Sequence, residues 1–280
     1  SFGLTGETIL RAGEPGIARD ALTKALAIAD ANGDALRAGR AALMLAAAEA
    51  ASGIPAFDRA RAAEAVLAGL LPAGRPELAG TRFIAASIAL HEGRAGEALP
   101  LAEAALADIV PRLQRAGADA TVASAGAGDL RQMVLPVLSA LWAVDPEGGI
   151  DTAFQAAQWA TVTRASRATQ RMAARTAAAS GDLATLARGK QDLVNRWQEA
   201  DRTYVAALGK GGGQAEGAVL AALEGEIAAT DAALAAQFPE YAALVTPEAL
   251  SVAEVQARLT PGEALVMIVP APAETFVFAV

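Results

Sequence analysis

Glycine recurs at an interval of 40 residues in the first third of the sequence, at Gly13, Gly53 and Gly93. The residues around them recur with it: the same shift carries Gly6 onto Ala46 and Ala86, Leu22 onto Ala62 and Ala102, Ala25 onto Ala65 and Ala105, and Leu26 onto Val66 and Leu106. Small residues let two helices cross closely, and glycine suits the turn that joins them. The period therefore predicts three stacked helix–turn–helix units, which is an α-solenoid.

A fourth unit follows if the offset lengthens to 55 residues, which brings Gly93 onto Gly148. The additional residues fall at 114–128, whose Gly, Ala, Ser and Asp content predicts an exposed loop. The first helix of this unit would begin after Asp129 as its N-cap and would kink at Pro136. We expect the repeats to occupy residues 1–165.

The composition agrees with a helical fold. Hydrophobic residues make up 54% of the chain but aromatic residues only 4%, because alanine supplies most of the apolar surface. Alanine is the best helix former, and its small side chain allows close packing of helices. An all-α fold class is therefore expected over most of the chain.

The third unit resembles a tetratricopeptide repeat (TPR) in a set of small residues at fixed spacing: Ala86, Gly93, Ala98, Ala105 and Leu106, with Pro111 just beyond. The second unit departs from this pattern, since Asp58 stands at the first small position of its second helix. The aromatic positions of the family are mostly missing, and the period exceeds the usual 34 residues or so. A HEAT-like array, with its longer repeat, is therefore an open alternative, and both arrays are α-solenoids.

Two long amphipathic segments follow, at 183–208 and 215–238, separated by the glycine-rich break at 209–213. Their apolar residues are spaced by three and four, the pattern of a helix with one buried face. We expect residues 166–245 to form a long antiparallel helical hairpin that serves as a linker or docking arm.

The last segment, 246–280, changes character. Ser251 and Glu254 form the S-x-x-E pattern of a capping box, which predicts a short helix through Leu259. Two strand-like runs, 265–269 and 275–280, follow around a proline-rich turn. An isolated hairpin is marginally stable in water, so these strands are expected to need further structure.

The order of motifs here resembles the start of the CHAT domain, a caspase-like domain that follows TPRs in many bacterial proteins. The matching residues are F-P-x-Y at 238–241, L-S-x-x-E-V-Q at 250–256, P-G-E-A-L at 261–265 and the strand F-V-F-A-V at 276–280. The helix at 153–176 also resembles the one that these proteins carry before the hairpin. The resemblance implies a parent protein that is a cysteine peptidase with a His–Cys pair beyond Val280. The C-terminal hairpin would then begin a truncated α/β domain.

We therefore expect a protein–protein interaction and regulatory region, which binds a protein or peptide partner and controls the downstream CHAT domain. The alternative is a non-catalytic TPR-like or HEAT-like scaffold, whose last strands pair with another chain. An enzyme within these residues is not expected, because cysteine is absent and no nucleophile–base pair or metal cluster is visible. No cofactor is expected either.

The net charge of −8 argues against nucleic-acid binding, which requires clustered Lys and Arg. No membrane span or signal peptide is visible, so we expect no membrane partner and a cytoplasmic location. The first residue is Ser1 rather than methionine, which leaves the natural N-terminus undefined.

If the TPR alignment holds, the first helices of the repeats would present a partner-binding groove. Basic, aromatic and hydroxyl side chains there would suit an extended peptide. The residues expected to share that surface are Arg11, Arg40, Phe83, Ser87, His91 and Trp142.

Overall fold

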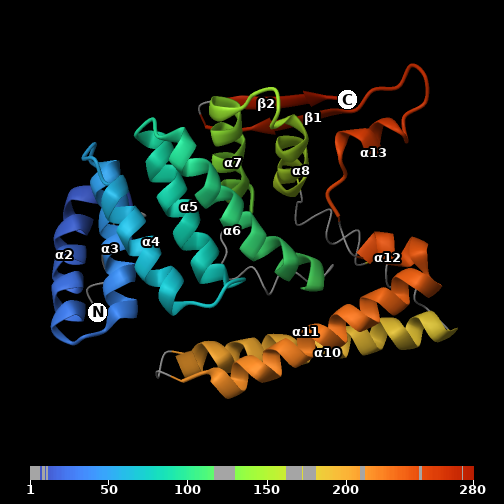
Figure 1. Cartoon of the computed structure of the whole chain (residues 1–280), viewed down its shortest axis with the longest axis horizontal. Coiled ribbons are helices and arrows are strands. Elements are labelled where there is room, and N and C mark those ends of the chain that lie inside the picture. Colours follow the sequence, from blue (N-terminus) through green and yellow to red (C-terminus); the bar gives the residue numbers. More distant parts are fainter. Residues whose placement is uncertain are drawn as a thin grey trace. The chain divides into compact units, whose positions relative to one another are not determined.

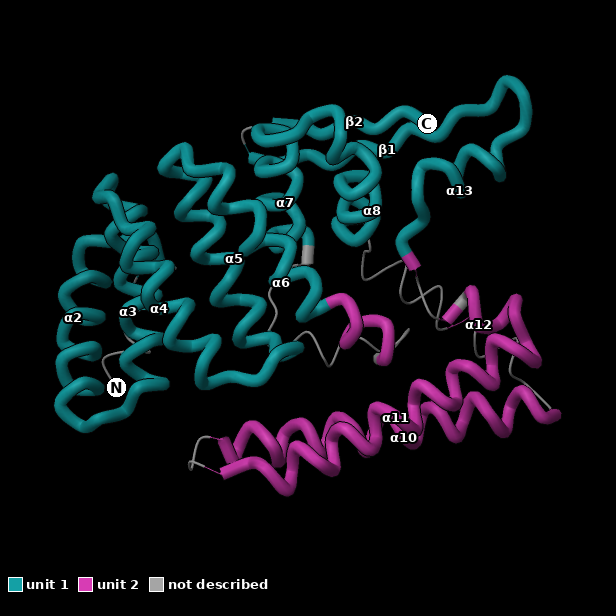
Figure 2. The backbone as a smooth tube through the Cα atoms, in the orientation of Figure 1, with its two compact units in different colours: residues 1–109, 126–161, 249–280 teal, residues 110–125, 162–248 magenta. Residues whose placement is uncertain are grey.

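A computed structural model describes residues 7, 10, 12–116, 130–161, 172, 181–208, 212–245, 248–272 and 274–280. The chain divides into two units (Figure 2). Unit 1 comprises residues 1–109, 126–161 and 249–280, and unit 2 comprises 110–125 and 162–248.

Unit 1 is a series of helices that pack against their neighbours in sequence, followed by a two-stranded hairpin (Figure 1). Its elements are α2 (Pro15–Ala31), α3 (Ala35–Ala51), α4 (Phe57–Leu70), α5 (Pro76–His91), most of α6 (Ala95–Ala116), α7 (Leu130–Val144), α8 (Ile150–Thr161), α13 (Val252–Gln256), β1 (Val266–Pro270) and β2 (Thr275–Ala279). The predicted fold class, mostly helical with a C-terminal β-hairpin, is confirmed.

The glycines at the 40-residue interval form the turns between helices, as predicted. Gly13, Gly53 and Gly93 have φ angles of +83°, +74° and +72°. A residue with a Cβ is disfavoured in this left-handed region, whereas glycine adopts it freely. The sequence period therefore marks the places where one helix stops and the chain reverses.

The second repeat, formed by α3 and α4 within unit 1, departs from the predicted alignment of small residues. Ala62 and Ala65, expected at a helix crossing, are exposed, and Val66 has 46% of its surface exposed. The reason is the longer turn: α4 begins four residues after Gly53, whereas α2 and α6 begin two residues after their turn glycines. The extra residues shift the buried face of α4 by two positions. Ala60, fully buried, thus takes the place that Ala18 and Ala98 hold in the other units.

This shift also explains why Asp58 departs from the TPR-like spacing of small residues. It has a second effect, the burial of a carboxylate. Glu64 occupies the α4 position that corresponds to Leu22 and Ala102, and only 4% of its surface is exposed. Arg82 of α5 lies between Glu64 and Asp108, with its Nε 3.2 Å from the Glu64 carboxylate. A buried carboxylate needs such a partner, because an unpaired charge is costly away from water. The ion pairs therefore compensate for the register of α4.

Neighbouring repeats are also joined through the start of α4. No side chain at the N-terminal end of α4 caps the helix. Instead, the Glu92 carboxylate accepts hydrogen bonds from the backbone N–H groups of Ala56 and Phe57, at 2.6 and 2.9 Å. The first N–H groups of a helix lack intrahelical partners and favour a negative charge nearby. Glu92, in the turn after α5, thus supplies the cap for a helix of the preceding unit.

Gly39 of α3 packs closely against Leu67 of α4. A Cβ atom at this position would lie 3.0 Å from both Cγ and Cδ2 of Leu67. Replacing Gly39 with valine is therefore expected to force the helices apart and to lower the free energy of unfolding by about 1–3 kcal/mol. Urea denaturation followed by circular dichroism measures this change. Gly80→Ala, which meets no atom within 4 Å, is the control. Equal stability of the valine variant and the natural protein would contradict this packing.

The fourth repeat consists of the predicted helix pair, α7 and α8, and Pro136 lies inside α7. The predicted loop at 114–128 begins too early, because α6 continues to Ala116. Residues 117–129, including the predicted N-cap Asp129, lie outside the described residues. Of the helix expected at 153–176, α8 contains the part up to Thr161, and most of the remainder is likewise outside the described residues.

Unit 2 contains the predicted helical hairpin, formed by α10 (Gly181–Leu208) and α11 (Gln214–Gln237), and the short helix α12 (Pro239–Val245). Trp197 is fully buried in its core. The Arg112 guanidinium, from the end of α6, lies 4.6 Å from the centre of the Trp197 ring and 2.8 Å from the Asp201 carboxylate. The Trp197 indole N–H donates to Glu224 of α11. Trp197 of α10 therefore joins its own helix to α11 and to the end of α6.

The predicted capping box opens α13. The Ser251 backbone N–H and hydroxyl both donate to the Glu254 carboxylate at 2.8 Å, and the Glu254 N–H donates back to the hydroxyl. The bond from the Ser251 backbone N–H is the main reason why the pKa of Glu254 lies below its ordinary value. A lowered pKa means that this stabilisation is present above the unfolded-state pKa and is lost as the pH falls through the folded-state pKa.

Ser251→Ala is expected to raise the pKa of Glu254 toward its ordinary value, because the hydroxyl donor is removed. A carboxyl titration by NMR measures the change. Glu263 is the internal control, since its own lowered pKa depends on the backbone N–H of Thr260. An unchanged Glu254 titration, or an equal shift at Glu263, would show that the hydroxyl does not hold this carboxylate.

Candidate functional site

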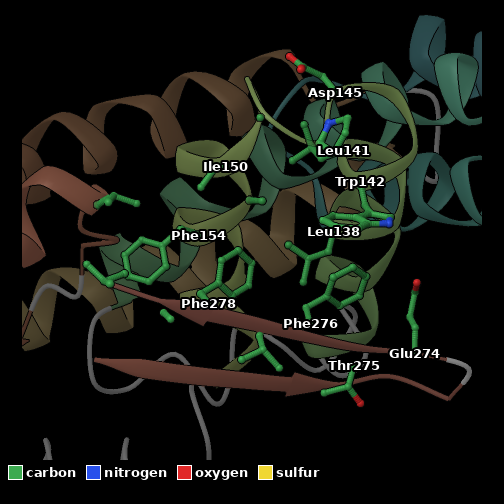
Figure 3. Close-up of a pocket in the computed structure, with 17 residues that line it drawn as sticks. Leu138, Leu141, Trp142, Asp145, Ile150, Phe154, Glu274, Thr275, Phe276 and Phe278 are labelled. Atoms are coloured by element: carbon green, nitrogen blue, oxygen red, sulfur yellow. The ribbon is translucent and has the colours of Figure 1, made fainter. Parts of the chain in front are cut away.

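The β-hairpin packs one face on the last helix pair of unit 1. The strands are antiparallel, and Val269 pairs with Phe276 and Met267 with Phe278. Side chains alternate between faces along a strand, so these four share one face. Figure 3 shows Phe276 and Phe278 directed toward α7 and α8. Phe278 meets Phe154 of α8 edge to face, with ring centres 5.8 Å apart.

Polar contacts fix the C-terminal segment against the same two helices. Ser139 of α7 donates to the Glu274 carboxylate, and the Arg131 guanidinium donates to the carbonyl of Pro270. The Asp151 carboxylate accepts from the backbone N–H of Val252, next to the capping box. These bonds span about 100 residues of sequence or more, so they define a site that forms only in the folded chain.

The other face of the hairpin is apolar and exposed. Val266, Ile268 and Val277 have 57%, 59% and 61% of their surface exposed. Strands of a soluble sheet normally place polar residues on a face that contacts water. Here three β-branched aliphatic residues lie side by side on the exposed face of two paired strands.

A groove of about 640 Å³ lies between β2 and the α7–α8 pair (Figure 3). Its walls are mostly apolar, and its charged members are two carboxylates, Asp145 and Glu274. The lining residues are Leu138, Leu141, Trp142, Asp145, Pro146, Gly149, Ile150, Ala153, Phe154, Val252 and residues 274–280. No Lys, Arg or His occurs among these described residues.

All residues of β2 line this groove, and the strand carries backbone hydrogen-bonding groups that β1 does not use. Leu265 and Val280 exchange both of their backbone hydrogen bonds, and Ala271 donates to Glu274. Because such pairs alternate along an antiparallel ladder, residues 276 and 278 also bond to β1. The N–H and C=O groups of Thr275, Val277 and Ala279 point the other way, along the free edge of β2. In the described part of the chain, β1 pairs with the opposite edge of β2 and no strand pairs with this one.

The described residues expected in a repeat groove lie on α3, α5 and α7, and they differ in exposure. Arg40 on α3 and Ser87 and His91 on α5 are exposed, and the latter two lie one turn apart on one helix face. Phe83 has only 6% of its surface exposed, so its ring belongs to the core. Trp142, 66% exposed, lines the groove beside β2. Arg11 lies outside the described residues.

The sequence predicted the strands but not the groove beside β2, and it assigned Trp142 to the repeat groove instead. The signal for it was the alternation in T-F-V-F-A, which places Phe276 and Phe278 on one face. Among the described residues, no group of three or more His, Asp or Glu side chains is arranged to hold a metal ion. In the same residues, no helix is long and apolar enough to cross a membrane.

Comparison of the chain with protein-family models, curated proteins and solved structures gave no match. The structure shows a mostly helical protein of consecutive helix pairs, which ends in a two-stranded antiparallel hairpin.

Proposed function

We propose that this chain is the partner-recognition and regulatory region of a caspase-like cysteine peptidase of the TPR–CHAT type. The His–Cys pair would lie outside these 280 residues, in a domain that the hairpin begins. The helix pairs would bind a protein or peptide partner, and that binding would control the peptidase.

The observation that carries this proposal is the exposed apolar face of the hairpin, made by Val266, Ile268 and Val277. A two-stranded sheet with helices on one face has the arrangement of an α/β domain that lacks its second helical layer. Helices or strands of a following domain would bury the three side chains. Burial of each is worth roughly 1.5–3 kcal/mol when complete, which is enough to attach the hairpin firmly to such a domain.

The helical part supports the recognition role. Stacked helix pairs commonly bind extended segments of other proteins. Arg40, Ser87 and His91 are exposed on first helices of the repeats, where such a segment would contact them. We expect alanine at these positions to weaken partner binding.

Thiol labelling of the protein produced by its natural gene tests the peptidase proposal. These 280 residues contain no cysteine, so any alkylated cysteine must lie beyond them. A thiolate beside an imidazole reacts at neutral pH, where an ordinary thiol is mostly protonated. We expect iodoacetamide at pH 6–7 to add one carboxamidomethyl group rapidly, and the mass of the labelled peptide locates it. A product without a reactive cysteine would contradict the proposal.

The second candidate is a non-catalytic scaffold whose strands pair with another chain. The same exposed face and the free edge of β2 favour it, since either can be covered by a separate protein. It predicts an unreactive product that co-purifies with a second polypeptide, whereas the peptidase proposal predicts a reactive thiol in the same polypeptide.

A further inference from the structure

We propose that the groove beside β2 binds an extended segment of a separate protein partner by strand addition, and that this segment alternates apolar residues and carries lysine or arginine at its ends. The inference deepens the recognition part of the proposed function and rests on it. It concerns the groove lined by α7, α8 and β2, and not the outer face of the hairpin.

The free edge of β2 provides the backbone contacts. Thr275, Val277 and Ala279 direct their N–H and C=O groups away from β1, toward the groove. An added strand could bond to all three residues, which is the usual way in which an extended peptide joins a sheet. The outer edge of β1 is less suitable: Pro270 lacks an N–H, and Arg131 already binds its carbonyl.

The helices provide the side-chain contacts. A strand added to β2 would direct every second side chain toward α7 and α8, onto Leu141, Trp142 and Ile150. Trp142 and Ile150 are exposed by 66% and 51%, so they have apolar surface to bury. Valine or isoleucine at alternate positions of the partner fits these walls.

The acidic residues that line the groove favour a partner segment with basic residues. Asp145 and Glu274 are the charged residues of the described lining, and both are acidic. Basic residues at the ends of the partner segment would complement them and would be steered toward the groove. A second copy of this chain fits poorly: its own β2 carries Glu274, and two chains of net charge −8 would bring like charges together.

The test uses the 280-residue protein and the synthetic peptide acetyl-KVTVTVK-amide, with binding measured by isothermal titration calorimetry at low salt. We expect a dissociation constant on the order of 100 µM or tighter. N-methylation of alternate residues removes the peptide's donors toward β2, and it should weaken binding at least tenfold. Glutamate in place of both lysines should weaken it about as much.

Two proline variants form a matched pair. Val277 and Ile268 are directly opposed, and the N–H of each points away from the partner strand. Val277→Pro therefore removes a donor from the groove edge, whereas Ile268→Pro removes one from the other edge, and proline is tolerated at such edge positions. We expect peptide binding to fall at least tenfold in the first variant and to change less than twofold in the second. Circular dichroism and the melting midpoint show whether each remains folded.

Trp142→Ala provides a test that does not depend on a folded proline variant, because the side chain is mostly exposed. It should weaken binding several-fold without changing the melting midpoint. The inference is overturned if the peptide does not bind at 1 mM (about ten times the expected constant), or if the N-methylated peptide binds equally well. It is also overturned if the edge of β2 instead pairs with a second copy, seen as a dimer that Val277→Pro abolishes, or with a strand that follows Val280, seen as loss of peptide binding in the longer natural product. Thiol labelling of the natural product is independent of all these results, so failure of the groove and failure of the peptidase proposal are distinguishable.

Discussion

Trp197→Ala is expected to lower the free energy of unfolding of unit 2 by about 3–5 kcal/mol, the usual cost of deleting a large buried aromatic side chain. The ring is fully buried between α10 and α11. Its loss also removes the surface on which the Arg112 guanidinium stacks and leaves the Glu224 carboxylate without the indole donor. Because Arg112 is only 4% exposed, it cannot regain full hydration when the ring is removed.

Urea denaturation followed by circular dichroism at 222 nm measures this loss. Trp197→Phe retains an aromatic ring for Arg112 and should recover more than half of it. Trp142→Ala is the matched control, since the same substitution at a residue with 66% of its surface exposed should cost less than about 1 kcal/mol. If the two alanine variants are equally stable, Trp197 does not organise the core of unit 2.

Phe57→Ala is expected to destabilise unit 1 by a similar amount, about 3–5 kcal/mol. Phe57 is 2% exposed at the start of α4, and the Arg94 guanidinium lies 4.2 Å from the centre of its ring. Its backbone N–H is also one of the two that Glu92 caps. The substitution therefore acts where the second and third repeat units are joined.

The neighbouring Asp58 separates the role of the ring from that of the ion pair. Asp58 binds Arg94 at 2.8 Å, but its side chain is 92% exposed, so Asp58→Ala should cost less than about 1 kcal/mol. Thermal unfolding of both variants compares them directly. Equal losses would mean that the ion pair, rather than the buried ring, joins the two units.

The sequence was a good guide wherever the structure depends on local features. The turn glycines were predictable because each needs a positive φ, and the capping box because its two side chains are three residues apart. The register of α4 was not, since it depends on the length of the turn after Gly53 rather than on the repeat interval. The period stays at 40 because the longer turn is offset by a shorter helix: α4 has 14 residues, whereas α2 has 17.

The groove could not be predicted because its parts are distant in sequence. The alternation in β2 shows that Phe276 and Phe278 share a face, but it does not show which helix they meet. The contacts that decide this, Phe154 with Phe278 and Ser139 with Glu274, join segments more than 120 residues apart. Trp142 was predicted as part of the groove that the repeats would present, and the structure places it in the groove beside β2.

We propose that the hairpin of this chain begins a peptidase domain. The intact mass of the product of the natural gene, with the reading frame followed past Val280, is the sharpest test of this proposal. We expect a longer polypeptide in which a histidine and a cysteine follow successive strands. A natural product that ends at Val280 would contradict it and would leave a scaffold whose strands another chain completes.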